Sequence, residues 1–251
     1  MIELILGNVG SGKTAKTVRE MINTNDKKFI TNIDIHKKEG YDTSHIKRLK
    51  PEHIINKELI KTKQNGKKEF EYSLNTHYWK NLIKKEKNVN IVIDEAHTFF
   101  NPRRSMSKLN IIMTDFLALL RRVLGSSDSD SGKLVLISQL SRRLDVIAKE
   151  MATKISYSKC YYMKYCYDCG ASWQENNELP DKMYKCLRCN SPLIQKDSFL
   201  IEVFEFNDIF NFDRFYNGGQ RTYYNRYIIT DIQSYFGFYN TLQWDDMITF
   251  L

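Results

Sequence analysis

The chain has 251 residues, a formal net charge of +8 and a pI of about 9.1. This length can hold one large domain, or a main domain with a small insertion. No apolar run approaches the roughly 18 residues that cross a bilayer, and no basic and apolar leader opens the sequence. We therefore expect a soluble, intracellular (cytoplasmic) protein without a membrane span.

The N-terminal residues predict a strand, a glycine-rich loop and a helix. Residues 1–6 are apolar enough for a buried strand, and apolar residues recur at helical spacing in 13–23. Residues 7–14 between them match the phosphate-binding (Walker A) pattern G-x-x-x-x-G-K-[ST]. This context favours a phosphate site over a turn that binds nothing.

We expect Lys13 to reach the β- and γ-phosphates of ATP, and the Thr14 hydroxyl to bind Mg²⁺. The helix N-terminus adds partial positive charge next to the phosphates. Backbone N–H groups of the loop are expected to bind phosphate oxygens; they belong to Gly7, Asn8, Val9, Gly10, Ser11 and Gly12.

A second strand is predicted at 28–35, and a basic zone, which we define as residues 37–87, follows it. This zone carries fourteen Lys or Arg residues and seven Asp or Glu residues, which accounts for most of the net charge. Such a zone suits a polyanion such as nucleic acid, although a solvated lysine-rich surface has the same composition. We expect short helices and loops within it, and a helix over 75–87 at its end.

The strand predicted at 89–93 ends in Asp94 and Glu95, as a Walker B strand does. Asp94 is expected to hold Mg²⁺, and Glu95 to act as the general base that polarises the attacking water. Residues 94–97 also match the Asp-Glu-Ala-His motif of one helicase superfamily. Those helicases need two motor domains, which 251 residues cannot supply, so we expect His97 to pack or hydrogen-bond locally.

Helices predicted over 107–124 and 141–151 alternate with apolar strands over 134–137 and 154–158, and a flexible loop covers 125–132. Strands that alternate with helices predict an α/β protein with a mostly parallel sheet flanked by helices, here the P-loop NTPase (ASCE/RecA-like) fold.

In such sheets the ligand lies at the carboxyl ends of the strands, so Gly7, Asp94 and Gln139 can share one nucleotide. Gln139 is expected to sense the γ-phosphate or to orient water. An arginine from a neighbouring subunit could complete the site, and Arg121 and Arg122 are our candidates for this finger. Further arginine pairs at 103–104 and 142–143 leave the choice open, because any of these side chains could form a solvated face or contact DNA.

Four of the five cysteines form two close pairs with the spacing C-x₂-C-x₁₆-C-x₂-C, which is typical of a zinc ribbon. Four thiolates leave no open coordination position, so the predicted Zn²⁺ site is structural; its ligands are Cys166, Cys169, Cys186 and Cys189. Cys160 is left over and is expected to be a buried strand residue. Aromatic and cationic residues around the cysteines leave DNA contact and protein docking equally open for the ribbon.

The ribbon interrupts the chain between a strand predicted near 154–164 and another at 199–206, so we expect an insertion at the tip of a hairpin. The expected domain layout is a P-loop ATPase core over 1–159, a zinc-ribbon insertion over 160–198, and C-terminal strands over 199–251 that complete the ATPase domain.

Several of these stretches resemble the FtsK/HerA superfamily of DNA-pumping ATPases, notably residues 119–122, 133–139 and 144–147. Residues 94–100, with Arg103 and Arg104, look like the phage branches of that superfamily. Those branches include viral genome-packaging ATPases and zonula-occludens-toxin-like phage assembly proteins. The resemblance covers about residues 1–160, and the 125–132 loop is longer than the tight connection usual in the superfamily.

The resemblance implies a homo-oligomeric ring, hexameric or similar, that binds ATP between subunits and moves double-stranded DNA through its pore. It also implies that Gln139 is the strand-end sensor and that an arginine near 121 acts in trans. The implied function is an ATP-hydrolysing DNA translocase, a genome-packaging motor of a virus or mobile element. Such a motor works in the host cytoplasm or on the virion, docked on a capsid or portal protein.

Two alternatives remain open. One is a toxin-like ATPase for virion assembly or extrusion that acts on protein partners, and the other is a nucleotide-switched zinc adaptor that hydrolyses ATP negligibly. The toxin-like branch carries a membrane span, for which this sequence offers no candidate run, and this favours packaging over extrusion.

Overall fold

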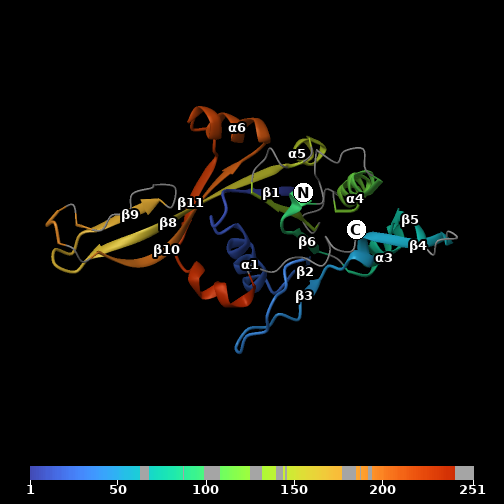
Figure 1. Cartoon of the computed structure of the whole chain (residues 1–251), viewed down its shortest axis with the longest axis horizontal. Helices are drawn as coiled ribbons and strands as arrows, with labels where there is room; N and C mark the ends of the chain where they lie inside the picture. The colour runs from blue at the N-terminus through green and yellow to red at the C-terminus, as the bar shows by residue number, and fades with distance from the viewer. Residues whose placement is uncertain are drawn as a thin grey trace.

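The computed structural model describes residues 1–62, 68–86, 88–98, 108–124, 132–139, 144, 146–176, 185–186, 188–191 and 194–240. Among these residues, a nine-stranded sheet has helices on both faces, and a separate two-stranded hairpin lies at one end (Figure 1). The main path of the sheet runs β11 (Asn225–Ile229), β10 (Ile194–Phe206), β8 (Lys154–Cys166), β1 (Ile2–Leu6), β7 (Leu134–Ser138), β6 (Val89–Ile93), β2 (Lys28–Thr31) and β3 (Ile46–Arg48). The strands off this path are β9 (Ser172–Asn176), which pairs with β8, and the hairpin strands β4 (Ile55–Thr62) and β5 (Lys68–Leu74). The helices are α1 (Lys13–Asn23), α2 (Pro51–Ile54), α3 (Thr76–Lys85), α4 (Lys108–Leu124), α5 (Val146–Glu150) and α6 (Ile209–Gly218), with 3₁₀ turns η1 (Ala96–Thr98) and η4 (Ile232–Phe238).

The strand order places three strand ends side by side. All neighbouring strands from β8 to β3 are parallel, whereas β9, β10 and β11 join the sheet antiparallel. Strand β7 lies between β1 and β6, so the carboxyl ends of these three strands meet at one edge of the sheet. This is the mostly parallel α/β sheet of a P-loop NTPase, and it confirms the predicted fold class.

Both faces of the sheet are covered, which explains why its central strands are almost entirely apolar. All five residues of β1 are buried; Leu4 belongs to one core and its neighbour Ile5 to the other. Helices α3, α4 and α6 contribute to the first core, where Trp79 is fully buried. Helix α1 and η4 contribute to the second, with Met21 and Phe238. A parallel sheet buried on both sides has no polar face, so its strands read as continuous apolar runs.

The basic zone differs most from its expected structure, because it contains the β4–β5 hairpin as well as a short helix. Six of the eight side chains of β4 are exposed, so this strand lacks the alternation of apolar and polar residues that would reveal it. Cross-strand contacts stabilise the hairpin, and Lys57 Nζ lies 4.6 Å from the centre of the Phe70 ring.

Several boundaries also differ from the expected ones. Strand β2 ends at Thr31 rather than at residue 35, and Ile35 forms an isolated bridge with Tyr239. Strands β8 and β10 are longer than expected because they pair with each other from Phe206 and Ile155 to Ile194 and Cys166. Their far ends form, with β9, an arm that extends to one side of the core, opposite the β4–β5 hairpin (Figure 1).

Parts of two other expectations lie outside the described residues. The helix predicted over 141–151 is described only in part: helix α5 begins at Val146, Leu144 is not helical, and residues 140–143 and 145 are not described. Residues 125–131 of the predicted loop are not described either. The C-terminal segment supplies the edge strand β11 and η4, while residues 241–251 are not described.

A buried ion pair joins helix α1 to strand β1 directly below the phosphate loop. Glu3 and Lys16 are 3% and 5% exposed, and Glu3 Oε1 lies 3.8 Å from Lys16 Nζ. Ser156 donates a hydrogen bond of 2.6 Å to the same carboxylate, and Lys154 bridges it to Glu205. Removing one partner of such a cluster leaves a buried charge without its counter-ion.

We therefore expect Glu3→Gln to lower the free energy of unfolding by about 3 kcal/mol, because Lys16 stays buried without its partner. The matched control is Arg19→Gln on the same helix, which breaks the exposed pair with Asp231 and should change stability by less than about 1 kcal/mol. Urea unfolding of both variants measures this. Equal effects at the two sites would contradict the assigned role of the buried pair.

Candidate metal centre and nucleotide site

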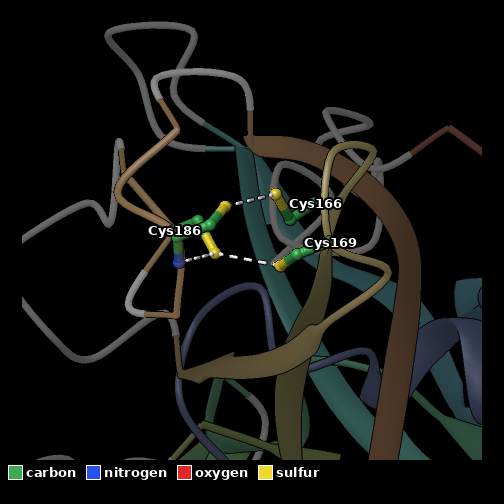
Figure 2. A group of neighbouring side chains, drawn as sticks. Cys166, Cys169 and Cys186 are labelled. Atoms are coloured by element: carbon green, nitrogen blue, oxygen red, sulfur yellow. Dashed lines mark hydrogen bonds between the residues drawn. The ribbon is translucent and has the colours of Figure 1, made fainter.

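The four paired cysteines converge at the far end of the arm (Figure 2). Their sulfur atoms all lie within 4.8 Å of one another, with Cys166 and Cys189 3.6 Å apart and Cys169 and Cys186 3.5 Å apart. Zinc–sulfur bonds of about 2.3 Å at tetrahedral angles place neighbouring sulfurs about 3.8 Å apart. Only thiols make up this donor set, so the group fits a closed structural Zn²⁺ site.

Each cysteine pair lies in a turn of the same form. Gly170 and Asn190, which follow the second cysteine of each pair, have positive φ angles of 66° and 60°. Their N–H groups donate to the carbonyl oxygens of Cys166 and Cys186, at 3.0 and 2.8 Å. Backbone N–H groups of 188 and 189 also donate to Cys186 Sγ. Burial alone would raise the pKa of this thiol, but these hydrogen bonds help to lower it to about 6. The second turn therefore supports a thiolate at Cys186, which is the zinc-binding form, whereas the pKa values of the neighbouring Cys169 and Cys189 thiols are raised. Cys160 lies apart from them, buried in the core on the α1 side.

The phosphate loop is pressed against strands β8 and β10. Gly12 has a φ of 80°, and a Cβ at this position would collide with the side chain of Ile201 on β10. A Cβ at Gly7 would lie 2.5 Å from the carbonyl oxygen of Ser158 on β8. Only glycine fits at both positions, so the loop backbone packs directly on the two strands. Such a loop can offer its backbone N–H groups to a phosphate group.

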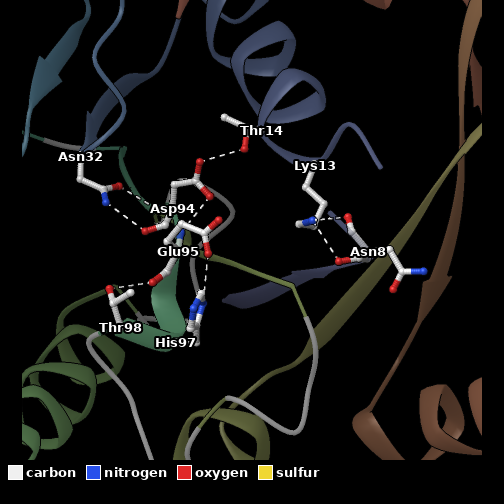
Figure 3. A network of polar contacts seen from close by, with 9 residues as sticks. Asn8, Lys13, Thr14, Asn32, Asp94, Glu95, His97 and Thr98 are labelled. Carbon is white, nitrogen blue, oxygen red and sulfur yellow. Dashed lines mark hydrogen bonds and ion pairs between the residues drawn. The ribbon is translucent and has the colours of Figure 1, made fainter. Parts of the chain in front are cut away.

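Lys13 folds back over this loop (Figure 3). Its Nζ donates to the carbonyl oxygens of Gly7 at 2.9 Å and Asn8 at 2.8 Å, and the residue is only 8% exposed. Burial lowers the pKa of Lys13, while the nearby carboxylates of Asp94 and Glu95 partly oppose that shift. The ammonium group thus lies among loop carbonyls, desolvated and close to two acids.

Thr14 and Asp94 are eighty residues apart in sequence but hydrogen-bonded in the structure. Thr14 Oγ1 donates to Asp94 Oδ2 at 2.8 Å. Protein atoms surround the carboxyl group, although Asp94 as a whole is partly accessible. Burial raises the pKa of Asp94 to about 6, and the hydrogen bonds from the Thr14 hydroxyl and the Glu95 N–H oppose this rise. A hydroxyl and a carboxylate are the hard oxygen ligands that Mg²⁺ uses beside phosphate, so the pair fits that ion.

Asn32 is a site residue that the sequence interpretation missed. It follows β2, and its Oδ1 accepts from the Asp94 N–H at 2.7 Å while its Nδ2 donates to the Asp94 carbonyl at 3.0 Å (Figure 3). A polar residue directly after a strand, as at Gln139, could have indicated it. The predicted strand continued to residue 35, so Asn32 was placed inside the strand and not at its end.

Glu95 follows in a left-handed conformation with a φ of 49°, and Thr98 donates to its carbonyl oxygen from both N–H and Oγ1. The carboxylate lies 3.1 Å from His97 Nδ1, an ion-pair distance without the alignment of a good hydrogen bond. His97 is the main reason that the pKa of Glu95 is lowered; the side chain of Gln139 and the charge of Lys13 also contribute. His97 therefore does interact locally, but its partner is the candidate base.

Three of the expected site positions meet at the sheet edge. The Gly7 N–H donates to the Gln139 carbonyl at 3.3 Å, and the Gln139 side chain reaches Glu95. Their roles toward a nucleotide stay predictions. Arg121 and Arg122 lie in the last turns of α4, but their side chains, like both other arginine pairs, lie outside the described residues, so the finger assignment also stays a prediction.

Residues 1–167 match the family model described as "Zonular occludens toxin (Zot)". The chain belongs to the zonular occludens toxin family. This confirms the resemblance to the toxin-like branch of phage assembly proteins.

Among solved structures, this Zot family chain is similar to the N-terminal domain of zonular occludens toxin from Neisseria meningitidis, with 16% identity, 95% of this chain and 98% of that chain covered, and a TM-score of 0.46. It is also similar to the genome packaging NTPase B204 from Sulfolobus turreted icosahedral virus 2 in complex with ATP-gammaS, with 12% identity, 71% and 98% covered, and a TM-score of 0.37. No curated protein matches the chain. Among the described residues, no helix has both the length and the apolar character needed to span a membrane.

Purified protein should contain about one zinc ion per chain by elemental analysis, and Cys169→Ser should lose it, because a structural site needs all four thiolates. The matched control is Cys160→Ser, a buried cysteine outside the cluster, which should keep the metal. Zinc loss in both variants, or in neither, would contradict this metal centre.

Asp94→Asn should stabilise the metal-free protein at high pH. The folded pKa is about 6 and the unfolded one 3.8, so below about pH 3 the carboxyl group is protonated in both states and costs no stability. As pH rises through 6, the folded chain must ionise a buried group. In EDTA at pH 8 we expect the variant to exceed the wild type by up to about 3 kcal/mol in unfolding free energy.

This difference should shrink below pH 6 and vanish only near pH 3, below the unfolded pKa, as measured by urea unfolding across that range. Asp231→Asn serves as the exposed control and should change stability by less than about 1 kcal/mol at both ends of it. Equal stability of the wild type and Asp94→Asn at pH 8 would show that burial does not penalise this carboxylate.

Proposed function

We propose that this Zot family protein is an ATP-hydrolysing DNA translocase, a genome-packaging motor of a virus or mobile element. The observation that carries the proposal is the hydrogen bond from Thr14 to Asp94 beside the buried Lys13. It joins a phosphate loop to a carboxylate, and the next residue is a second carboxylate on the accessible side of the site.

The chemistry follows from the charges of these groups. The loop N–H groups and Lys13 bind the phosphates and balance the charge that develops on the γ-phosphate oxygens. Thr14 and Asp94 would hold Mg²⁺, which would supply positive charge beside the phosphates. Glu95 accepts a proton from water, whose oxygen bonds to the γ-phosphorus as the bond to the bridging oxygen breaks. ADP and inorganic phosphate leave, and Glu95 releases its proton to solvent.

Two observations support action on DNA by a ring. The basic zone carries most of the +8 net charge, and its β4–β5 hairpin exposes Lys57 and Lys61. The candidate site is also open at the surface: Val9 in the phosphate loop is 79% exposed, and half of the Glu95 side chain is accessible. A neighbouring subunit could therefore cover the site and supply Arg121 or Arg122, in a hexameric or similar assembly in the host cytoplasm or on the virion.

The proposed domain layout keeps the core at 1–159, the ribbon at 160–198 and the C-terminal strands at 199–251. Strands β10 and β11 belong to the same sheet as β1, which supports their inclusion in the ATPase domain. The arm that carries the cysteines is free to contact DNA or a capsid or portal protein.

Membership of the Zot family favours one other candidate, an ATPase for virion assembly or extrusion whose partner is a protein. The two functions share the hydrolytic site and differ in what stimulates it.

Linear duplex DNA should raise the steady-state ATPase rate of the wild type several-fold, because a translocase couples turnover to its track. Glu95→Gln should lower kcat by about 100-fold or more while ATP still binds, since it removes the general base alone. The matched control is Glu86→Gln, which disturbs an ion pair with Lys47 far from the loop and should leave turnover unchanged.

An ATPase that duplex DNA does not stimulate, but a capsid or membrane protein does, would favour assembly or extrusion. Tight ATP binding without turnover in the wild type would favour the nucleotide-switched zinc adaptor. Light scattering on the same samples tests the ring, which predicts a mass several times that of the 29.7 kDa chain.

A further inference from the structure

We propose that Asn32 is a positioning residue for hydrolysis, acting on Glu95 through the main chain of Asp94. This inference rests on the proposed ATPase function, because it concerns the same site. Asn32 makes two hydrogen bonds to the main chain of Asp94, the residue before Glu95, so the backbone gives it a direct route to the candidate base.

The geometry begins with the parallel pairing of β2 and β6. Their last paired residues are Thr31 and Val92, so Asn32 stands one residue beyond the ladder. At this position the Asn32 side chain, and not its backbone, makes the hydrogen bonds to the neighbouring strand end. Its carboxamide accepts from the Asp94 N–H at 2.7 Å and donates to the Asp94 carbonyl at 3.0 Å. Two bonds to one residue fix both the position of that residue and its rotation about the strand axis.

Fixing Asp94 matters because the next residue is strained. Glu95 has a φ of 49°, a conformation that costs a residue with a side chain about 1–3 kcal/mol unless its surroundings impose it. The structure holds this turn from both sides. Asn32 anchors its entry at Asp94, and Thr98 anchors its exit with two hydrogen bonds to the Glu95 carbonyl.

The two anchors decide where the Glu95 carboxylate points. Between them the side chain projects toward His97 and Gln139, near enough to Lys13 for that charge to act on its pKa. If the Asp94 anchor is lost, the turn can relax and the carboxylate moves away from the γ-phosphate side. A displacement of about 1 Å at a reacting group can cost about 100-fold in rate. Nucleotide binding is expected to depend on the loop N–H groups and Lys13, whereas the two hydrogen bonds of Asn32 act on Asp94, next to the base.

The chain offers a closely matched control. Asn90, on β6 itself, is 4% exposed, and its Oδ1 accepts from the Lys133 N–H at 2.8 Å. It makes the same kind of side-chain to main-chain bond in the same sheet, but at the other end of β6. A general loss of sheet stability would follow from either substitution, whereas misplacement of Glu95 should follow only from the change at Asn32.

The test measures kcat and the dissociation constant of a fluorescent ATP analogue with Mg²⁺ for Asn32→Ala, Asn90→Ala and the wild type. Asn32→Ala should lower kcat about tenfold or more and change the dissociation constant less than about threefold. Asn90→Ala should leave both unchanged. Asn32→Asp, which keeps the acceptor for the Asp94 N–H but cannot donate to the carbonyl, should show the same split between kcat and affinity.

A double-mutant cycle with Glu95→Gln separates positioning from other roles. Once the base is gone, Asn32→Ala should lower the residual single-turnover rate by no more than about twofold, because its effect passes through Glu95. The inference is overturned by an unchanged kcat in both Asn32 variants, by an affinity that falls together with kcat, or by a full effect in the Glu95→Gln background. It is also overturned if neither Asn32 variant folds while Asn90→Ala does. A different outcome would contradict the proposed function itself: the wild type shows no ATP turnover, or its turnover is unchanged in Glu95→Gln.

Discussion

The hydrogen bond between Thr14 and Asp94 is the contact on which the candidate site depends, because it brings the start of helix α1 to the end of strand β6. Nothing local in the chain enforces it. It exists because β7 lies between β1 and β6 and all three strands run parallel, which places their carboxyl ends in a row. Gln139 ends the middle strand, between the phosphate loop and the two acids. Strand order therefore determines the site, and the loops at the strand ends only adjust it.

The second half of the chain supports the loop from below. Ile201 on β10 fills the space where a side chain at position 12 would stand, and the Ser158 carbonyl does the same for position 7. The same two strands continue into the arm, β8 as far as Cys166 and β10 from Ile194. The cysteine cluster and the phosphate loop are therefore connected through one pair of strands.

Features with a local cause could be predicted from the sequence, and features that depend on distant partners could not. The loop motif and helix Lys13–Asn23 follow from spacing and glycine placement, and the helix has the predicted bounds. The cysteine spacing likewise places two similar turns together. Asn32 escaped prediction because its role depends on which strand lies beside β2, sixty residues further along the chain. The β4–β5 hairpin escaped because β4 is mostly exposed and shows no apolar alternation, although Phe70, Tyr72 and Leu74 alternate with polar residues along β5.

The charges at the loop remain unbalanced within the chain itself. Lys16, one turn beyond Lys13, is equally buried but has Glu3 as its counter-ion. Within the described part of the chain, the hydrogen-bond partners of Lys13 are carbonyl oxygens alone, and burial lowers its pKa, while burial raises that of Asp94 to about 6. Among the described residues, no ion pair joins the two, although each shifts the pKa of the other toward its charged form. A ligand that brings negative charge to the lysine and positive charge to the aspartate would remove both penalties at once. A triphosphate carrying a divalent cation has that pattern of charge, so its binding free energy would include the relief of strain already present in the folded chain.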